Sequence, residues 1–141
     1  MTSGDLLLDT NIISETRKSR PDTGVVAWIG SVEADRLHLS ALTIGEIELG
    51  IAKLRRRRDD RQAAYYADWL AAIAEGFAGR IVPVSVEIAR RWGQTGEVDP
   101  VSTVDALLGA TAQTYGWTLV TRNVKDFVSF DIPVFNPFAG T

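Results

Sequence analysis

Short apolar runs alternate along the chain with longer stretches whose apolar residues recur at helical spacing. Continuous apolar runs with the length of buried strands lie at Leu6–Asp9, Ile81–Val84 and Thr118–Thr121. Arg36–Ser40 alternates apolar and polar residues, which is typical of a strand, and Val134-Phe135 predicts a short edge strand. These segments are predicted to form the sheet of the protein.

Helical spacing occupies most of the chain between these strands. The predicted helices run around Val25–Val32, from Ser40 or Thr43 through Leu54, from about Asp59 to Glu75, from Ser85 through Trp92, and from Thr103 to Tyr115. Asp22 or Thr23 is expected to cap the first of them, and Gly116 to end the last. Because strands alternate with helices, we expect βαβ units and an α/β fold, with a mainly parallel sheet covered on both faces.

The composition is that of an ordinary globular protein. The chain has 141 residues, is 45% hydrophobic, and is expected to form one domain over residues 1–141. No apolar stretch approaches the ~20 residues of a membrane span. The N-terminus also lacks a basic segment ahead of an apolar one, so we expect a cytoplasmic protein with no membrane partner.

Cysteine, histidine and charge narrow the possible chemistry. The chain has no cysteine, which excludes disulfides, thiolate zinc sites and cysteine nucleophiles. Its single histidine, His38, argues against a zinc site built mainly from imidazoles. The net charge of −3 argues against a passive nucleic-acid binder, but not against an enzyme whose metal ions neutralise an acidic cleft.

Four acidic residues each lie where a predicted strand or helix begins or ends: Asp9, Glu46, Asp105 and Asp126. Asp9 closes the first strand, and Asp126 follows the strand Thr118–Thr121. Glu46 and Asp105 lie near the starts of two helices. Parallel strands point their carboxyl ends to one edge of the sheet, where ligands bind in open α/β sheets, and crossover helices return with their N-termini at that edge. We therefore expect the four carboxylates to share one cleft.

Carboxylates gathered in one cleft repel one another unless they are protonated or bridged by a cation. Mg²⁺ and Mn²⁺ are the economical cations, since both favour oxygen ligands. Helix N-termini favour anions, which keeps these carboxylates ionised and helps to receive a phosphate. The pattern therefore predicts a site for Mg²⁺, in which Mn²⁺ can substitute, that can also receive a phosphate.

Four motifs follow one another in the order of a known family. They are Leu7-Leu8-Asp9-Thr10-Asn11, Leu42-Thr43-Ile44-Gly45-Glu46, Val104-Asp105-Ala106-Leu107-Leu108-Gly109-Ala110-Thr111-Ala112 and Thr121-Arg122-Asn123-Val124-Lys125-Asp126-Phe127. With them, the chain resembles a PilT N-terminus (PIN) domain, specifically the VapC-type toxin ribonucleases of bacterial toxin–antitoxin pairs. The closing Val134-Phe135-Asn136-Pro137 is similar to the tail of the FitB-like branch, so the resemblance covers nearly the whole chain.

The resemblance implies a three-layer α/β/α sandwich with a mainly parallel central sheet, and Mg²⁺- or Mn²⁺-dependent endonucleolytic cleavage of RNA. By position, Asp9 and Asp105 match the principal metal ligands, and Glu46 matches the second acidic position. Many relatives carry an acid directly after Thr-Arg, where this chain has Asn123, and Asp126 lies three residues later. Either Asp126 replaces that acid in the catalytic site, which we favour, or Asn123 contributes a hydrogen bond there.

Other polar residues are candidates for supporting roles. Thr10, Asn11 and Thr121 are expected to orient the carboxylates, and a hydroxyl among them to hold a metal-bound water. The one basic cluster, Arg55-Arg56-Arg57-Arg58, complements the dipole at a helix end and is a candidate contact for RNA phosphates or an acidic partner. The resemblance also implies a homodimer, and a cognate VapB-like antitoxin with which the toxin assembles on operator DNA.

Two other functions stay open at this point. A haloacid-dehalogenase-like phosphatase also begins with a strand that ends in Asp, but it usually carries a second acid two residues later, where this chain has Asn11. A catalytically silent interaction module could use the same PIN fold. The intact acids count against it, and a metal-dependent nuclease assay separates the two.

Overall fold

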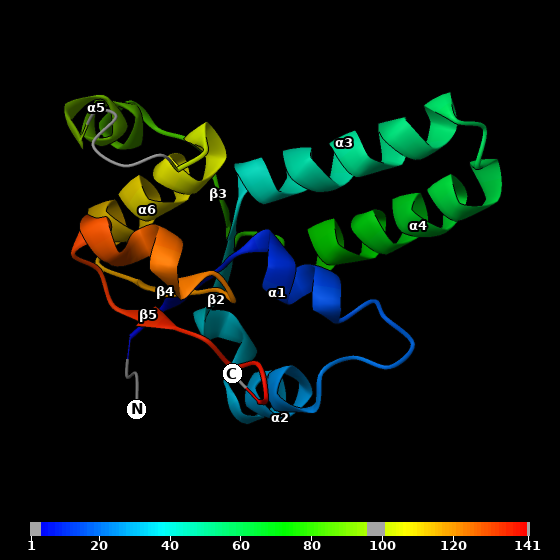
Figure 1. Cartoon of the computed structure of the whole chain (residues 1–141), viewed down its shortest axis with the longest axis horizontal. Coiled ribbons are helices and arrows are strands. Elements are labelled where there is room, and N and C mark those ends of the chain that lie inside the picture. Colours follow the sequence, from blue (N-terminus) through cyan, green and yellow to red (C-terminus); the bar gives the residue numbers. More distant parts are fainter. Residues whose placement is uncertain (1–3, 96–100, 141) are drawn as a thin grey trace.

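Five parallel strands form a sheet at the centre of the part of the chain that the structure, a computed structural model, describes, residues 4–95 and 101–140 (Figure 1). The strands are β1 Leu6–Leu8, β2 Leu37–Ser40, β3 Ile81–Val82, β4 Thr118–Val120 and β5 Val134–Phe135. They lie in the order β3-β2-β1-β4-β5, and each pairing between neighbours is parallel. The expected parallel α/β architecture is confirmed.

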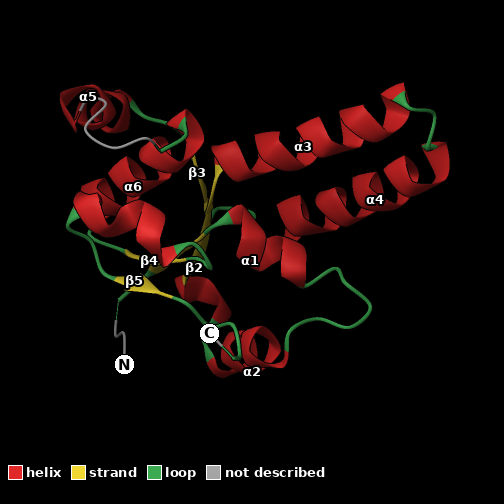
Figure 2. Cartoon of the chain, viewed as in Figure 1, coloured by secondary structure: helices red, strands yellow, loops and turns green. Residues whose placement is uncertain are grey.

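Helices lie on both faces of this sheet (Figure 2). They are α1 Thr10–Glu15, α2 Thr23–Ser31, α3 Ala41–Arg56, α4 Asp60–Gly76, α5 Val86–Thr95 and α6 Thr103–Tyr115, with the 3₁₀ helices η1 Ala34–Arg36 and η2 Val124–Phe130. Helices α1 to α4 contribute to the core on one face, and α6 and η2 to the core on the other, with α5 packed against α6. No helix within residues 4–95 and 101–140 is long and apolar enough to cross a membrane.

Alternation along the strands explains how one sheet supports two cores. Successive side chains of a strand point to opposite faces. In β1, Leu6 and Leu8 pack into the core under α1 to α4, while Leu7 packs under α6 and η2. In β4, Val120 joins the first core and Leu119 the second. All five side chains are fully buried, as expected for a parallel sheet covered on both faces.

Most predicted elements are present, with shifts of one to a few residues at their ends. The sequence pattern does not predict α1, because this helix has only six residues and two of its first three are polar. The first strand also ends at Leu8, so that Asp9 is the N-cap of α1 and not the last strand residue. The predicted cap of α6 is wrong by one position. Ser102, and not Thr103, accepts a hydrogen bond from the backbone N–H of Asp105 at 3.1 Å.

The strand order places a switch point between β1 and β4. From β1 the chain moves outward to β2 and β3 on one side, and it then returns to β4 and β5 on the other. At such a point the connections leave toward opposite faces of the sheet, which opens a crevice beyond the carboxyl ends of the strands. Asp9 follows β1 and Thr121 follows β4, so these two residues lie on either side of the crevice.

Gly109 permits the close packing of α6 on η2. A Cβ atom added there would lie 2.5–2.7 Å from ring atoms of Phe130, whereas one added at Gly93 in α5 would meet nothing within 4 Å. We expect Gly109→Ala to lower the free energy of unfolding by about 1–3 kcal/mol through overpacking. Gly93→Ala should raise it by up to ~1 kcal/mol through helix propensity. Urea denaturation measures both, and equal stability of the two variants would contradict this packing.

Candidate active site

Asp9 is the buried centre of the candidate site. It is only 5% exposed, at the point where β1 ends and α1 begins. The backbone N–H of Thr10 donates to its Oδ1 at 2.7 Å, and the Thr121 hydroxyl donates to its Oδ2 at 2.8 Å. The Asn11 amide donates to the same Oδ2 at 3.3 Å. Neutral donors from two segments that are 110 residues apart in sequence therefore hold this carboxylate in place.

Asn11 and Thr121 join the two strand ends across the switch point. The Asn11 Nδ2 donates to Thr121 Oγ1 at 3.3 Å, and the Asn11 Oδ1 accepts from the backbone N–H of Arg122 at 3.2 Å. The backbone N–H of Asn123 donates to Thr121 Oγ1 at 3.0 Å, while the Asn123 side chain makes no capping hydrogen bond. Of the predicted supporting residues, Thr10, Asn11 and Thr121 lie in the network. Asn123 takes part in it through its main chain.

Glu46 approaches from α3. Ser40 caps this helix by accepting from the backbone N–H of Leu42 at 3.0 Å. The Thr10 hydroxyl donates to Glu46 Oε1 at 2.5 Å, and its oxygen also lies 3.0 Å from the hydroxyl of Thr43, which is fully buried. Thr10 thus connects the start of α1 to the acid on α3. Sequence reasoning missed this role of Thr43, although a Thr three residues before a Glu on one helix face is a readable signal.

Asp105 and Asp126 come from the opposite face of the sheet. Asp105 is half-buried in the first turn of α6, and its backbone N–H donates a hydrogen bond to the hydroxyl of Ser102. Asp126 is exposed in the first turn of η2, directly after the 121–123 segment that holds Asp9. The spacing Ser-x-x-Asp resembles a capping box and could have indicated Ser102 from the sequence.

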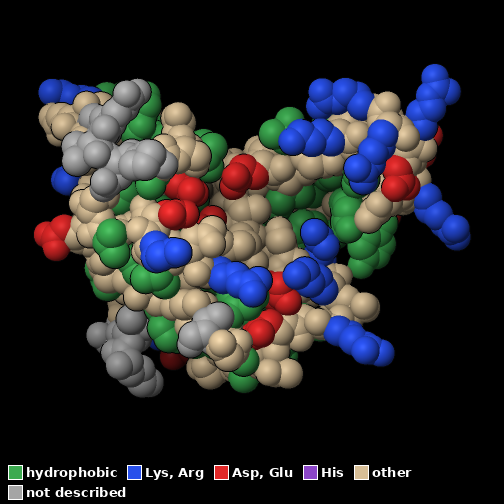
Figure 3. All heavy atoms as spheres, in the orientation of Figure 1, with side chains coloured by type: hydrophobic (Ala, Val, Ile, Leu, Met, Phe, Trp, Pro, Cys, Tyr) green, Lys and Arg blue, Asp and Glu red, His purple; other side chains and the backbone are tan. Residues whose placement is uncertain are grey.

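The four acids form one electrostatic group. The pKa of Asp9 is raised from its usual 3.8 to about 6, mainly by burial; the charges of Asp105 and Glu46 add to this rise, and the hydrogen bonds from Thr121 and Thr10 oppose it. Burial also raises the pKa of Asp105, and the charges of Asp126 and Glu46 add to this, against the hydrogen bond with Ser102. Figure 3 shows acidic side chains gathered in the hollow between the α6 and α3 sides of the molecule.

The donor set suits a hydrated divalent cation. Within residues 4–95 and 101–140, no three His, Cys, Asp or Glu side chains are grouped so that they could hold a metal ion by themselves. Mg²⁺ does not require such a cage, because it usually binds one or two carboxylates and keeps several waters or substrate phosphates. Asp9 and Asp105 are two mutually repelling carboxylates in an oxygen-rich crevice. They fit such an ion, and the chain has no cysteine and a single histidine, His38, to supply the ligands that zinc usually prefers.

A family model described as the PIN domain matches residues 6–132. The chain belongs to the PIN domain family. The predicted resemblance is therefore confirmed, and the crevice described above is that of a PIN domain.

Relatives with known names support the same branch. Toxin FitB of Neisseria gonorrhoeae is 33% identical over 138 residues, which cover 94% of this chain and 98% of FitB. VapC ribonuclease Y4jK of Sinorhizobium fredii is 31% identical over 142 residues, which cover 94% and 97%. This PIN domain is thus similar to FitB and VapC proteins along nearly their whole length.

Solved structures agree with this grouping. The FitAcB structure from Neisseria gonorrhoeae matches with a TM-score of 0.83 and 33% identity, covering 94% of this chain and 97% of the other. A FitAB structure bound to a DNA fragment gives the same TM-score and identity, with 94% of each chain covered. VapBC2 from Rickettsia felis, at 21% identity and a TM-score of 0.67, shows the shared fold alone.

The raised pKa of Asp9 predicts how stability depends on pH. Since this pKa is about 6 in the folded PIN domain and 3.8 ordinarily, the folded state binds more protons between these values. Asp9 should therefore cost stability at pH 7, and this cost should disappear as the pH falls from about 6 to 4. In EDTA, we expect Asp9→Asn to be more stable than wild type by about 1–3 kcal/mol at pH 7.

The comparison should be made at pH 7 and at pH 4.5, with the exposed Asp68→Asn on α4 as a control for a change of net charge. The advantage of Asp9→Asn over wild type should shrink at the lower pH, while the control should show no such pattern. An advantage of the same size at both pH values would contradict the raised pKa.

Proposed function

We propose that this chain is a divalent-metal-dependent endoribonuclease and the toxin of a type II toxin–antitoxin pair. The observation that carries the proposal is the group of four carboxylates at the switch point of the sheet, with Asp9 buried among neutral donors. The names of the relatives support the substrate and the biological class, since they include a toxin and a VapC ribonuclease at 31–33% identity.

Asp9 and Asp105 are the residues to which we assign the metal, Mg²⁺ or Mn²⁺. A divalent ion held by these two carboxylates would supply charge stabilisation to a phosphodiester and would make water a stronger nucleophile near neutral pH. Thr121 and Asn11 fix Asp9 through its Oδ2, and Ser102 fixes the turn that carries Asp105. These contacts hold both carboxylates before RNA arrives, which lowers the cost of ordering the site.

Glu46 and Asp126 complete the site in this proposal. The Thr10 hydroxyl donates a hydrogen bond to Glu46 Oε1. The other carboxylate oxygen, Oε2, is then available to accept a hydrogen bond from the attacking water. Asp126 acts from the outer side of the site through its repulsion of Asp105. No side chain needs to be the nucleophile.

The rival chemistries find less support in the described residues. His38, the only histidine of the chain, stacks on Trp117 at 4.1 Å and has no partner for a histidine acid–base pair. Asn11, at the position where a haloacid-dehalogenase-like phosphatase carries its second acid, bridges Asp9 to the backbone of Arg122. A silent module would not need buried carboxylates that repel one another, since they destabilise the fold.

The partners in this proposal follow from the relatives. FitA and FitB occur together on DNA in one solved structure, and VapBC2 of Rickettsia felis is bound to a fragment of its promoter in another. By analogy, we propose a small VapB-like antitoxin, assembly with it on operator DNA, and a homodimer of this chain. Tyr65, which is 57% exposed, is the aromatic side chain that we propose for the dimer interface, whereas the neighbouring Tyr66 and Trp69 pack against the core.

The central test is metal-dependent cleavage of RNA. Purified protein should cut labelled RNA with Mg²⁺ or Mn²⁺ and lose this activity in excess EDTA. Asp105→Asn should lower the cleavage rate by more than the 10–100-fold typical of outer-shell changes, that is by more than roughly 100-fold. Asp68→Asn should leave the rate unchanged. Undiminished cleavage by clean protein in EDTA would refute the proposed mechanism.

A second test separates the two candidates for the fourth position. Asn123 enters the network through its backbone N–H, which Asn123→Ala retains, so this variant should keep near-wild-type cleavage. Asp126→Asn should raise the Mg²⁺ concentration for half activity, with a loss of about 10–100-fold at limiting metal. Titration of cleavage with Mg²⁺ measures both. Greater damage from Asn123→Ala would assign the position to Asn123, and negligible effects from both would leave a site of three carboxylates.

A further inference from the structure

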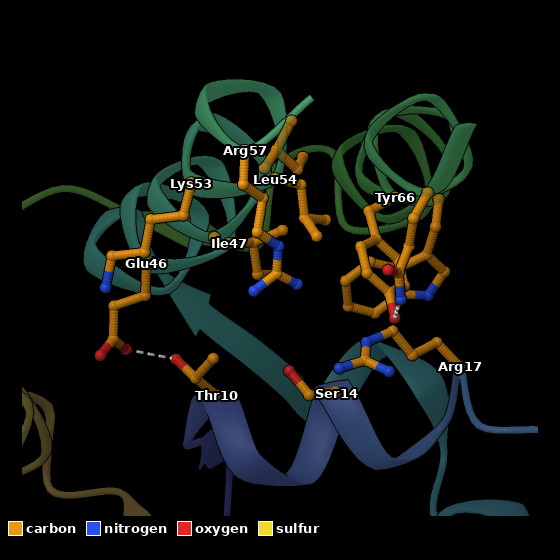
Figure 4. Close-up of a pocket in the computed structure, with 13 residues that line it drawn as sticks. Thr10, Ser14, Arg17, Glu46, Ile47, Lys53, Leu54, Arg57 and Tyr66 are labelled. Carbon is orange, nitrogen blue, oxygen red and sulfur yellow. Dashed lines mark hydrogen bonds between the residues drawn. The ribbon is translucent and has the colours of Figure 1, made fainter. Parts of the chain in front are cut away.

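A pocket of about 390 Å³ opens beside the acids, between α1, α3 and α4 (Figure 4). Glu46 and Thr10, which belong to the acid site, line one end of it. Arg17 and Tyr66 line the other end, as Figure 4 shows. The pocket is thus a continuation of the candidate active site, and it is large enough to receive part of a substrate.

The spacing of residues along α3 builds one wall of this pocket. Glu46, Gly50, Lys53 and Arg57 are separated by four, three and four residues, so they share one face of the helix. The face changes from acidic at Glu46 to basic at Lys53 and Arg57. Gly50 lies between them, and a Cβ added there would meet nothing within 4 Å, so the space in the middle of the wall is open.

The pocket has more positive than negative charge, although the chain is acidic. Arg17, Lys53 and Arg57 line it together with the single carboxylate of Glu46. Within residues 4–95 and 101–140, the ion pairs are Lys18–Glu15 and Arg91–Glu87, so none of the three cations is paired with an acid. These unneutralised cations attract an anionic ligand.

An aromatic platform stands at the basic end. The Arg17 guanidinium lies over the ring of Tyr66, at 4.6 Å from its centroid, and 6.0 Å from the centroid of Trp69. Gln62 donates to the Tyr66 hydroxyl at 2.9 Å, which fixes the ring. Cations along a groove together with flat rings and guanidinium planes are the features that bind single-stranded nucleic acid, where bases stack and phosphates pair with the cations.

We propose that this pocket binds the RNA nucleotide next to the scissile phosphate, with Lys53 and Arg57 at its phosphates and the base stacked on the Arg17–Tyr66 platform. The proposal rests on the ribonuclease function proposed above, because the pocket shares Glu46 with that site. Arg17, Lys53 and Arg57 have no acid partner in the pocket, and the phosphates of RNA would neutralise their charge. RNA is therefore the occupant that the charges favour.

This assignment gives different roles to the four residues of the basic cluster Arg55-Arg56-Arg57-Arg58. Arg57 alone among the four lines the pocket, while the others are exposed outside it. Arg55→Met is therefore a matched control for Arg57→Met. Both remove the same charge from the same helix end.

The experiment measures binding of a fluorescein-labelled 12-nucleotide RNA of mixed sequence to Asp105→Asn protein, in which we expect cleavage to be too slow to interfere. Fluorescence anisotropy is recorded at several NaCl concentrations with Mg²⁺ present. We expect Arg57→Met to weaken binding about 3- to 10-fold at low salt and to reduce the salt slope by ~0.7, the value for one lost phosphate contact on a single strand. Arg17→Met removes part of the stacking platform, so it should weaken binding by about 3- to 10-fold with a smaller change of the slope. Arg55→Met should change affinity less than 2-fold and leave the slope unchanged.

Tyr66 tests the platform separately. Tyr66→Leu keeps an apolar side chain but removes the ring, and it should weaken binding about 5-fold or more without changing the salt slope, while Tyr66→Phe should bind as wild type. Circular dichroism and thermal melting establish that each variant is folded. If Arg17→Met and Arg57→Met bind RNA like Arg55→Met but lose binding to the cognate antitoxin, the pocket belongs to the protein partner and the proposal is wrong.

Cleavage assays distinguish this inference from the proposed function. With Asp105 intact, Arg57→Met should raise KM and leave the Mg²⁺ concentration for half activity unchanged. If wild type cleaves RNA and Arg57→Met has the KM of Arg55→Met, the pocket assignment fails and the ribonuclease function stands. If wild type cleaves no RNA but the differences in RNA binding persist, the pocket assignment stands and the proposed cleavage fails.

Discussion

The hydrogen bond from Thr121 to Asp9 joins the two halves of this protein at the point where the sheet changes direction. This bond, 2.8 Å long, links the ends of β1 and β4, whose connections leave toward opposite faces of the sheet. Asp9 also starts α1 by accepting from the N–H of Thr10, and the hydroxyl of Thr10 then orients Glu46 on α3. One buried carboxylate therefore connects the two central strands to helices α1 and α3. A change at Asp9 acts on all of them.

Among residues 4–95 and 101–140, no cationic side chain forms an ion pair with this carboxylate. Its hydrogen-bond donors are a hydroxyl, a backbone N–H and an amide, and neither ion pair of the described residues involves any of the four acids. Arg122 is the nearest cation in sequence to Thr121, yet its guanidinium lies 4.5 Å from the ring centroid of Phe138, and its charge lowers the pKa of Asp22. A purely structural acid would gain stability from a basic neighbour. The arrangement instead keeps negative charge in the crevice, as a cation-binding site requires.

Sequence patterns predicted the parts of the fold whose signal is local. The burial of Leu6, Leu7 and Leu8 and the C-terminal Gly116, with its φ of 69°, follow from apolar runs and from the preference of glycine for left-handed backbone. Helix α1 was missed because six residues cannot form a stable helix alone, so its existence depends on the contacts of Asp9 and Ile12 in the folded core.

The candidate site was predictable to the same extent. The sequence predicted that the four acids lie at one edge of the sheet. Parallel strands end at that edge and crossover helices begin there, so the positions of the acids within the elements were sufficient. The spacing of Thr43 from Glu46 and of Ser102 from Asp105 marks both residues as candidates, but which hydroxyl faces which atom depends on the folded structure. The pocket could be predicted only in part from the sequence. Its α3 wall is visible in the spacing of Lys53 and Arg57, but the approach of Arg17 to Tyr66 arises only when α1 packs beside α4.

The distribution of charge on α3 explains how an acidic protein could bind the RNA substrate proposed above. A net charge of −3 would repel RNA at a distance, and clustered carboxylates alone would repel it again at the site. Because Glu46 and the pocket cations share one helix face, the basic wall begins where the acidic edge ends. RNA held by Lys53 and Arg57 would bring its backbone to the carboxylates, where a divalent ion reverses the sign of the local field. Attraction and catalysis are thereby assigned to neighbouring parts of a single rigid element.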